Sequence, residues 1–170
     1  EVFTGTLPFR GESATAVVAV SDGMRRDILR SYPDLDPGKV RVIYNGIDVE
    51  AWRPRTDHAL LERHGIDPNA PSVVFVGRIT RQKGLPYFLR AAALLPKNVQ
   101  IVMCAGAPDT PQIMAEVEGL VRELQQSRDG VVWIDEFLQR DELCAILTSA
   151  TTFVCPSIYE PLGIVNLEAM

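Results

Sequence analysis

The sequence lacks any long apolar run and any excess of positive charge. No stretch approaches the roughly 20 apolar residues of a membrane-spanning helix. Residues 1–10 (EVFTGTLPFR) also lack the basic flank and apolar centre of a signal peptide. The formal net charge of −5 argues against binding nucleic acid or anionic membranes through overall charge, although a local basic pocket is still allowed. We therefore expect a cytoplasmic protein with no membrane span and no nucleic-acid partner.

Cysteine and histidine are too scarce for a disulfide framework or an evident metal centre. The chain of 170 residues has three cysteines and two histidines. Cys104 and Cys155 lie in apolar, strand-like runs, which favours reduced core residues. His58 and His64 flank a polar helical stretch, with no further cluster of ligands to support zinc. We expect no metal site and no resident cofactor.

Two common nucleotide-binding fingerprints are also absent. No Gly-x₄-Gly-Lys-Ser/Thr loop occurs, and no Gly-x-Gly-x-x-Gly follows a predicted strand. A P-loop nucleotidase is therefore excluded, and a dinucleotide-dependent dehydrogenase is disfavoured.

The chain has the composition and periodicity of a folded α/β protein. Hydrophobic residues make up 46% of the sequence and charged residues 23%, which is enough to bury a core. Four apolar strands are predicted at 72–77, 99–106, 131–135 and 151–156. They alternate with helices predicted at 85–95, at 112–127, at 141–149 and from Gly163 onward. This alternation predicts a Rossmann-like, doubly wound parallel sheet. We expect the helix at 85–95 to be well buried, and an apolar stripe of the helix at 112–127 to lie on the sheet, formed by Ile113, Val117, Leu120, Val121 and Leu124.

The region before this sheet has an organisation of its own. A strand at 15–20, a helix that Ser21 or Asp22 can cap, and a strand at 40–44 are predicted. Residues 51–71 then carry three prolines around a short helix at about 58–64, which is typical of a linker. We therefore predict the end of one domain over residues 1–50, a linker over 51–71, and part of a second domain over 72–170.

A polar loop, GRITRQKG (77–84), follows the first strand of the predicted sheet. Gly77 allows the backbone to approach a ligand, and Arg78 and Lys83 are cations. A diphosphate needs such groups, because arginine offers a planar fork of donors and lysine a compact charge. Ligands of these sheets bind beyond the carboxyl ends of the strands. The alternative interpretation is solvated charge in a surface loop.

A second constellation follows the last predicted strand. Glu160 precedes Gly163, where a helix would begin with its free N–H groups facing the loop. Glu168 lies about 7.5 Å further along that helix, at about 1.5 Å per residue. A phosphate at the helix start could therefore lie between hydroxyl groups bound by the two carboxylates. The alternative is that Glu160 complements the helix dipole and Glu168 is an ordinary surface residue.

Four ordered motifs together resemble a known family: AVSDGM, VIYNGID, FVGRITRQKG and EPLGIVNLE. They resemble the retaining glycosyltransferases of family four, which have the GT-B fold. The Glu-x₇-Glu spacing of Glu160 and Glu168 is that family's signature. The resemblance covers about residues 15–170, and VGRITRQKG, CAGAPDTP and FVCPSIYEPLGIVNLEAM are most similar to the actinobacterial glycogen synthase branch.

The resemblance implies a role for each matching residue. The donor diphosphate is held by Arg78 and Lys83 beside Gly77. The transferred sugar meets Glu160, and the ribose meets Glu168. Backbone amides of Gly163, Ile164 and Val165 meet the sugar or the distal phosphate, and the base rests near Phe137 and Leu138. The resemblance thus implies Arg78, Lys83 and Glu160 as the catalytic set, without a metal.

The implied activity is transfer of glucose from a nucleoside diphosphate glucose, ADP-glucose in this branch, to an α-1,4-glucan or to glucose 1-phosphate in glycogen synthesis. The alternatives are another donor, such as UDP-glucose or GDP-mannose, or a non-catalytic nucleotide-sugar-binding or interaction module on the same fold. A sugar-nucleotide epimerase fits less well. Compared with a full GT-B enzyme the chain looks truncated, so we expect little turnover from it alone. A homodimer is compatible with the sequence.

Overall fold

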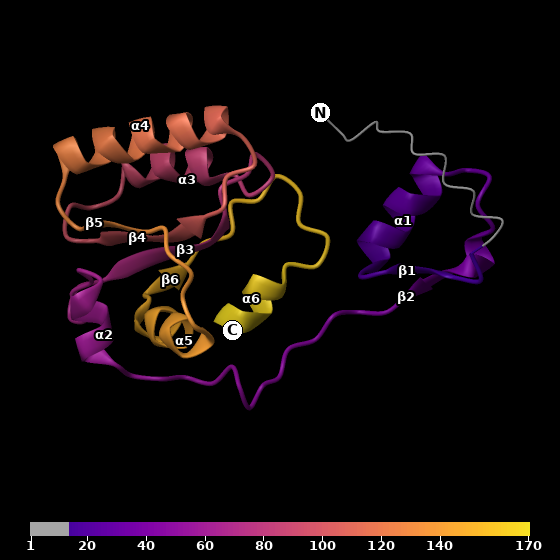
Figure 1. Ribbon diagram of the computed structural model, residues 1–170, viewed down its shortest axis with the longest axis horizontal. Coiled ribbons are helices and arrows are strands. Elements are labelled where there is room, and N and C mark those ends of the chain that lie inside the picture. Colours follow the sequence, from indigo (N-terminus) through magenta and orange to yellow (C-terminus); the bar gives the residue numbers. More distant parts are fainter. Residues whose placement is uncertain (1–13) are drawn as a thin grey trace. The chain divides into compact units, whose positions relative to one another are not determined.

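The computed structural model describes residues 14–170, which form two compact units that divide between Gly46 and Ile47 (Figure 1). The part of the predicted first domain that precedes residue 14 lies outside the described residues. The division falls a few residues before the boundary predicted at residue 50. The assignment of these units to the domains of a larger enzyme remains a prediction.

The first unit is a small β-α-β arrangement. Its elements are β1 (Val17–Ala19), α1 (Asp22–Ser31), the short 3₁₀ helix η1 (Pro37–Lys39) and β2 (Val40–Val42). The two strands pair in parallel, and both are shorter than predicted. The Ser21 hydroxyl accepts a hydrogen bond from the Met24 amide at 3.0 Å, which confirms one of the two predicted caps of α1.

The second unit is a four-stranded sheet covered by helices. Its elements are α2 (His58–Arg63), β3 (Ser72–Arg78), α3 (Leu85–Ala92), β4 (Gln100–Gly106), α4 (Pro111–Ser127), β5 (Val131–Ile134), α5 (Arg140–Ser149), β6 (Thr152–Phe153) and α6 (Ile164–Ala169). The strand order is β5-β4-β3-β6, and every pairing is parallel. The predicted doubly wound parallel sheet is therefore confirmed. β6 is much shorter than the predicted 151–156, and it pairs with β3 alone at the edge of the sheet.

The two faces of this sheet carry different helices, as Figure 1 shows. Phe75 of β3 and Met103 of β4 point into a core with α3 and α4. Val74 and Val102, their neighbours in sequence, point to the opposite face and pack in a second core with α2 and α5. Successive strand residues point to opposite faces, so a strand buried on both faces is apolar throughout.

The apolar stripe of α4 is found as predicted, but α3 differs from its prediction. Within the stripe, Ile113, Val117, Val121 and Leu124 are buried, and Leu120 is partly buried. The helix predicted at 85–95 ends at Ala92 and is not buried all round, since Tyr87 is 60% exposed. α3 shares one core with the sheet and α4, and the side of α3 that carries Tyr87 faces away from this core and meets solvent.

The segment predicted as a linker contributes to the core of the second unit. Leu60 and Leu61 of α2 are buried, and so is Ile66 just after it. The Arg55 amide also donates to the Thr148 hydroxyl of α5 at 3.0 Å. Part of segment 51–71 therefore packs on the second unit, and the segment is not a free linker as its prolines had suggested.

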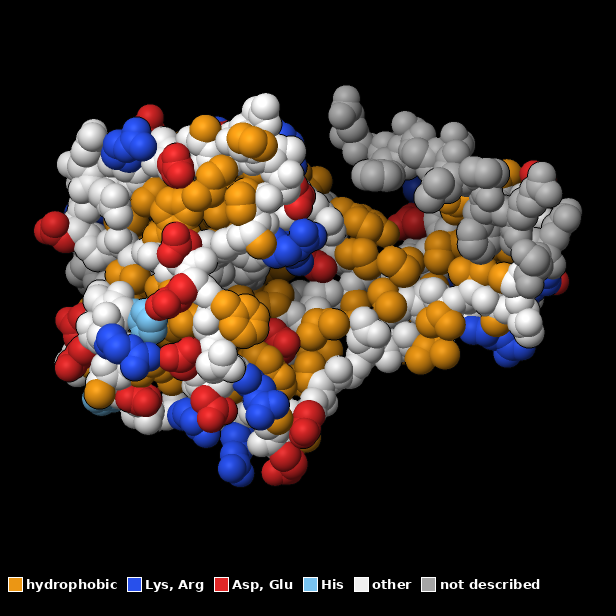
Figure 2. Space-filling model, in the orientation of Figure 1, with side chains coloured by type: hydrophobic (Ala, Val, Ile, Leu, Met, Phe, Trp, Pro, Cys, Tyr) orange, Lys and Arg blue, Asp and Glu red, His pale blue; other side chains and the backbone are white. Residues whose placement is uncertain are grey.

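The surface of the second unit mixes charges of both signs. Figure 2 shows acidic and basic side chains interspersed over the visible face, with apolar groups between them. Among the described residues, no helix is both long enough and apolar enough to cross a membrane.

Candidate functional site

The site lies where the strand order of the sheet reverses. β3 is flanked by β4 on one side and by β6 on the other, although β4 and β5 precede β6 in the chain. The chain turns to opposite sides after β3 and β6, and the loops that follow these strands meet beyond their carboxyl ends. Open parallel sheets bind their ligands at such a point. Both loops predicted to hold the site are therefore brought together.

A set of close contacts joins the loop after β3 to the loop after β6. The Gln82 carbonyl accepts from the Ile158 amide at 2.9 Å. The Gln82 side-chain amide donates to the Tyr159 carbonyl at 2.8 Å. Gly84 has φ +67° and lies so close to Pro156 that a Cβ at position 84 would come within 2.1 Å of the Pro156 oxygen. The two loops are therefore packed backbone against backbone.

Lys83 and Glu160 form an ion pair at the centre of this contact. Lys83 Nζ lies 2.5 Å from Glu160 Oε2, and their side chains are 22% and 19% exposed. The Ser157 hydroxyl donates to the same carboxylate oxygen at 3.0 Å. One oxygen of Glu160 is therefore held by two donors. A lysine ammonium has three donors, so Lys83 can serve both Glu160 and a further anion.

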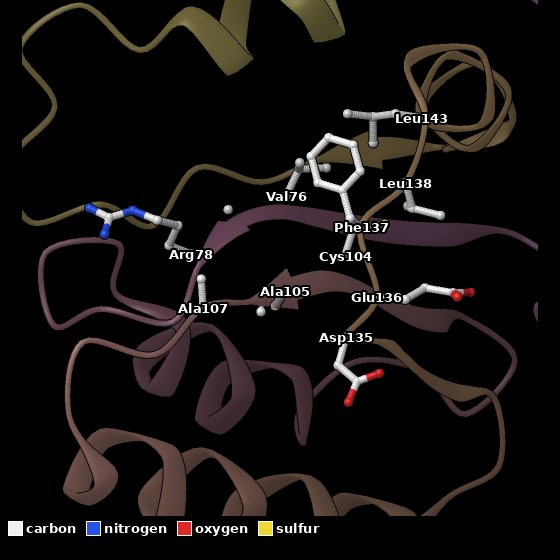
Figure 3. A pocket seen from close by; sticks show the side chains of 12 residues that line it. Val76, Arg78, Cys104, Ala105, Ala107, Asp135, Glu136, Phe137, Leu138 and Leu143 are labelled. Carbon is white, nitrogen blue, oxygen red and sulfur yellow. The ribbon is translucent and has the colours of Figure 1, made fainter.

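A pocket of about 370 Å³ opens beside this contact, at the carboxyl ends of β3, β4 and β5 (Figure 3). Its lining includes four residues that the sequence predicted for donor binding: Gly77, Arg78, Phe137 and Leu138. Figure 3 shows Arg78 on one side of the pocket and Phe137 with Leu138 on the other. The pocket therefore has a cation on one side and apolar groups on the other.

Apolar side chains make up much of the remaining lining. Val76, Cys104 and Leu143 line the pocket from β3, β4 and α5. Burial raises the pKa of the Cys104 thiol to about 12, so this residue stays a neutral, apolar-like group at ordinary pH. Pockets of this kind, apolar with a few polar groups at the rim, suit a flat organic ring.

Arg78 is already paired in this structure. Arg78 Nη1 lies 3.2 Å from Asp109 Oδ1, and the two side chains are 64% and 49% exposed. The Asp109 amide donates to the Ile79 carbonyl at 3.1 Å, which fixes the loop after β4 against the loop after β3. An exposed pair of this kind contributes little stability, so a ligand anion can replace it at small cost.

Sequence reasoning assigned no role to Asp109, Gln82 or Ser157. Each lies in a loop that follows a strand of the sheet, and this position in the sequence could have marked them as candidates. Asp135 and Glu136, two acidic residues after β5, also line the pocket and were not anticipated.

The helix predicted from Gly163 is short. α6 covers Ile164–Ala169 after Gly163, which has φ +70° and is buried. A Cβ at position 163 would lie 2.9 Å from Glu160 Cγ and 2.4 Å from Asn166 Nδ2, so glycine lets Glu160 lie against the helix start. The first amides of a helix have no partner within it. Of the predicted amide donors, Gly163 therefore lies against Glu160, and Ile164 and Val165 follow it in the first turn of α6.

Glu168 occupies a different environment from Glu160. Burial raises the pKa of the Glu168 carboxyl. Burial also raises the pKa of the Cys144 thiol of α5, and Glu168 is among the carboxylates that add to this effect. Among the described residues, no hydrogen bond or ion pair joins Glu168 to Arg78, Lys83 or Glu160. Glu160 therefore precedes α6 and Glu168 lies in its last turn, and only Glu160 belongs to the ion-paired centre.

The raised pKa of Glu168 predicts a pH-dependent effect on stability. A folded state with a raised carboxyl pKa binds the proton more tightly than the unfolded chain, so its free energy of unfolding falls as pH rises from about 4.5 through the folded pKa. Glu168→Gln removes this loss. We expect the variant to gain stability over the parent between pH 4 and pH 7, by about 0.5 kcal/mol or less because the carboxyl is only partly buried and solvent screens its charge.

Urea unfolding at several pH values measures this gain, with Glu123→Gln at an exposed position of α4 as the matched control. A difference between Glu168→Gln and the parent that is independent of pH would contradict the expectation.

A metal site is not apparent in the part of the chain that the structure describes. No group of three or more His, Cys, Asp or Glu residues is arranged to hold an ion there. The two cations beside the pocket can themselves balance the charge of a bound anion.

Comparison with known proteins places these features in a family. A family model described as "Glycosyl transferases group 1" matches residues 57–170, and a model described as "Glycosyltransferase Family 4" matches residues 6–51. The chain is 56% identical over 162 residues to the alpha-maltose-1-phosphate synthase of Mycolicibacterium smegmatis. The aligned residues make up 94% of this chain and 42% of that protein. The chain thus spans about two fifths of the length of the curated relatives it matches.

Solved structures of glycosyltransferases have the same fold. Sucrose-phosphate synthase from Thermosynechococcus elongatus is 27% identical with a TM-score of 0.72, over 93% of this chain and 39% of that one. The catalytic domain of starch synthase IV from Arabidopsis thaliana, bound to ADP and acarbose, is 25% identical with a TM-score of 0.74, over 92% and 37%. The predicted fold class, part of a GT-B glycosyltransferase, is confirmed. Because the first family model covers more than half of its residues, the chain belongs to the group 1 glycosyltransferases.

Proposed function

We propose that this chain carries the donor site of a retaining hexosyltransferase that moves glucose from ADP-glucose to an α-1,4-glucan or to glucose 1-phosphate. The observation that carries the proposal is the convergence of Lys83, Glu160 and the pocket beside Arg78 at the reversal of strand order. The 56% identical relative is an alpha-maltose-1-phosphate synthase, and this supports a glucosyl donor and a sugar phosphate acceptor.

The apolar side of the pocket suits the base of a nucleoside diphosphate, and its cationic side suits the phosphates. The base would rest by Phe137 and Leu138, over the apolar lining from Val76 and Cys104. The diphosphate would then reach Arg78, which exchanges Asp109 for phosphate oxygens. Arginine is suited to this because its fork can bind two oxygens at once. The ribose would lie toward Glu168, whose carboxylate can accept from its hydroxyls.

The sugar would lie at Glu160. Its Oε2 is occupied by Lys83 and Ser157, and the other carboxylate oxygen can accept from sugar hydroxyls. On this proposal the Glu160 carboxylate acts as an acceptor rather than a nucleophile. Retention then proceeds by front-face displacement, without a covalent intermediate on the protein and without two-carboxylate glycosidase chemistry.

The cations act on the leaving group. Cleavage of the bond from sugar to diphosphate places growing negative charge on the terminal phosphate. Lys83, Arg78 and the amides at the start of α6 would lie near that position and would interact more strongly with the charge as it develops. On this proposal no metal is required, since the two side chains supply the positive charge.

Truncation of either cation should weaken donor binding. Arg78→Ala and Lys83→Ala are each expected to reduce the affinity for ADP-glucose by about 1.5–3 kcal/mol, roughly ten- to a hundredfold, the range for charge-assisted hydrogen bonds. Calorimetric titration with ADP-glucose, UDP-glucose and GDP-mannose measures the effect and ranks the donors. Arg122→Ala, at an exposed position of α4, is the matched control and should leave affinity unchanged.

Two outcomes would contradict the proposal. If the folded chain binds none of the three donors, it carries no donor site. If Arg78→Ala and Lys83→Ala bind as tightly as the parent, these side chains belong to the surface and not to the site.

A further inference from the structure

Gln82 contacts the loop that carries Glu160 at two consecutive residues. Its carbonyl accepts from the Ile158 amide at 2.9 Å, and its side-chain amide donates to the Tyr159 carbonyl at 2.8 Å. Glu160 is the next residue along. Gln82 therefore binds the backbone immediately before the carboxylate that the proposed function places on the sugar.

The adjacent Lys83 binds the same loop through its side chain. Lys83 Nζ lies 2.5 Å from Glu160 Oε2, and the Lys83 amide donates to the Thr80 hydroxyl at 3.1 Å. Two neighbouring residues of one loop thus hold three neighbouring residues of the other. The Lys83 contact fixes one end of the Glu160 side chain, and the Gln82 contacts fix the backbone from which it projects.

The loop after β6 needs this support because it has little of its own. No helix or strand lies between Phe153 and Ile164, and Ile158 and Tyr159 are exposed, at 65% and 47%. Such a segment has many accessible conformations unless specific contacts select one. A group that meets a substrate must be held to within about 0.5 Å of its working position.

We propose that Gln82 is a positioning residue for the sugar end of the site. It acts through Glu160, by fixing the Ile158–Tyr159 backbone so that the carboxylate faces the sugar hydroxyls. The inference rests on the proposed function, and it goes beyond it because Gln82 itself neither lines the pocket nor belongs to the ion pair.

If Gln82 positions Glu160, its removal should weaken only the part of the binding that the sugar contributes. ADP and ADP-glucose share the base, ribose and diphosphate, and differ by the glucose. Removal of the Gln82 donor should therefore weaken the binding of ADP-glucose more than the binding of ADP. A general loss of the fold or of the loop structure would weaken the binding of both ligands alike.

The test uses Gln82→Met, which has a similar length, no charge and no donor. Calorimetry on the 170-residue chain gives the dissociation constants of ADP and ADP-glucose. The ratio of the ADP constant to the ADP-glucose constant is expected to fall about two- to tenfold from the parent's value, the range for one neutral hydrogen bond. Gln82→Lys keeps a donor at this position and is expected to restore most of the ratio.

Glu160→Gln separates this inference from the function on which it rests. The proposed function requires that this variant also loses preference for ADP-glucose over ADP. If it does, and Gln82→Met keeps the parent's ratio or weakens both ligands equally, the positioning role is wrong and the donor site stands. If Glu160→Gln keeps the ratio, or the parent binds neither ligand, the proposed function fails and the positioning role fails with it.

Discussion

Gly84→Ala is expected to lower the free energy of unfolding by about 2–5 kcal/mol and to abolish donor binding. Gly84 has φ +67°, where a residue with a Cβ is strained by about 1–2 kcal/mol. The new methyl would also come 2.1 Å from the Pro156 carbonyl oxygen, and that neighbour is backbone rather than a flexible side chain. Forcing such atoms apart typically costs about 1–3 kcal/mol more.

The loss of binding follows from the same displacement. Pro156 leads into the loop that carries Ser157 and Glu160, and Lys83 directly precedes Gly84. Moving one backbone away from the other would stretch the Lys83–Glu160 pair at the centre of the site. Urea unfolding and titration with ADP-glucose measure the two effects.

Gly119→Ala is the matched control for this substitution. Gly119 lies within α4, and a Cβ there meets nothing within 4 Å. Alanine should stabilise the helix by about 0.5–1 kcal/mol at this position. If Gly84→Ala proved as stable as Gly119→Ala, the close approach of the two loops would be refuted.

Arg128→Met should cost about 2–4 kcal/mol of stability without direct effect on the site. Arg128 is 6% exposed, and no carboxylate among the described residues pairs with it. Its guanidinium instead donates to backbone carbonyls at the end of α3 and in the turn that follows, those of Ala92, Leu95, Pro96 and Val99. Helix carbonyls at this end lack intrahelical partners, and each buried acceptor left unpaired costs about 1–3 kcal/mol.

Methionine keeps most of the apolar stem of the side chain, so the experiment isolates the donors. Arg122→Met, at an exposed position in the same region of the chain, should change stability by no more than about 0.5 kcal/mol. Equal midpoints of urea unfolding for the two variants would show that the carbonyls find other donors, for example water.

Local periodicity was sufficient to predict the architecture of the second unit. Strands such as 72–77 and 99–106 are continuous apolar runs, because both of their faces are covered by helices. Helix α4 shows its stripe for the opposite reason, since one side of it meets solvent. The limits of elements such as β6 and α3 were predicted less well, because pairing and packing partners decide which residues belong to the strand or the helix.

The residue pattern alone shows that polar and glycine residues follow the predicted strands, and therefore which loops could form a site. It also supplied Arg78, Lys83 and Glu160 as candidates through their residue types and spacing. Three features became visible only in the folded chain: Lys83 meets Glu160 across 77 residues, Arg78 pairs with Asp109, and Glu168 lies apart from this centre. The physical reason is that periodicity reports which side of an element is buried, whereas strand order decides which loops become neighbours. The position of β6 beside β3 follows from pairing between segments distant in the chain, and no local pattern encodes it.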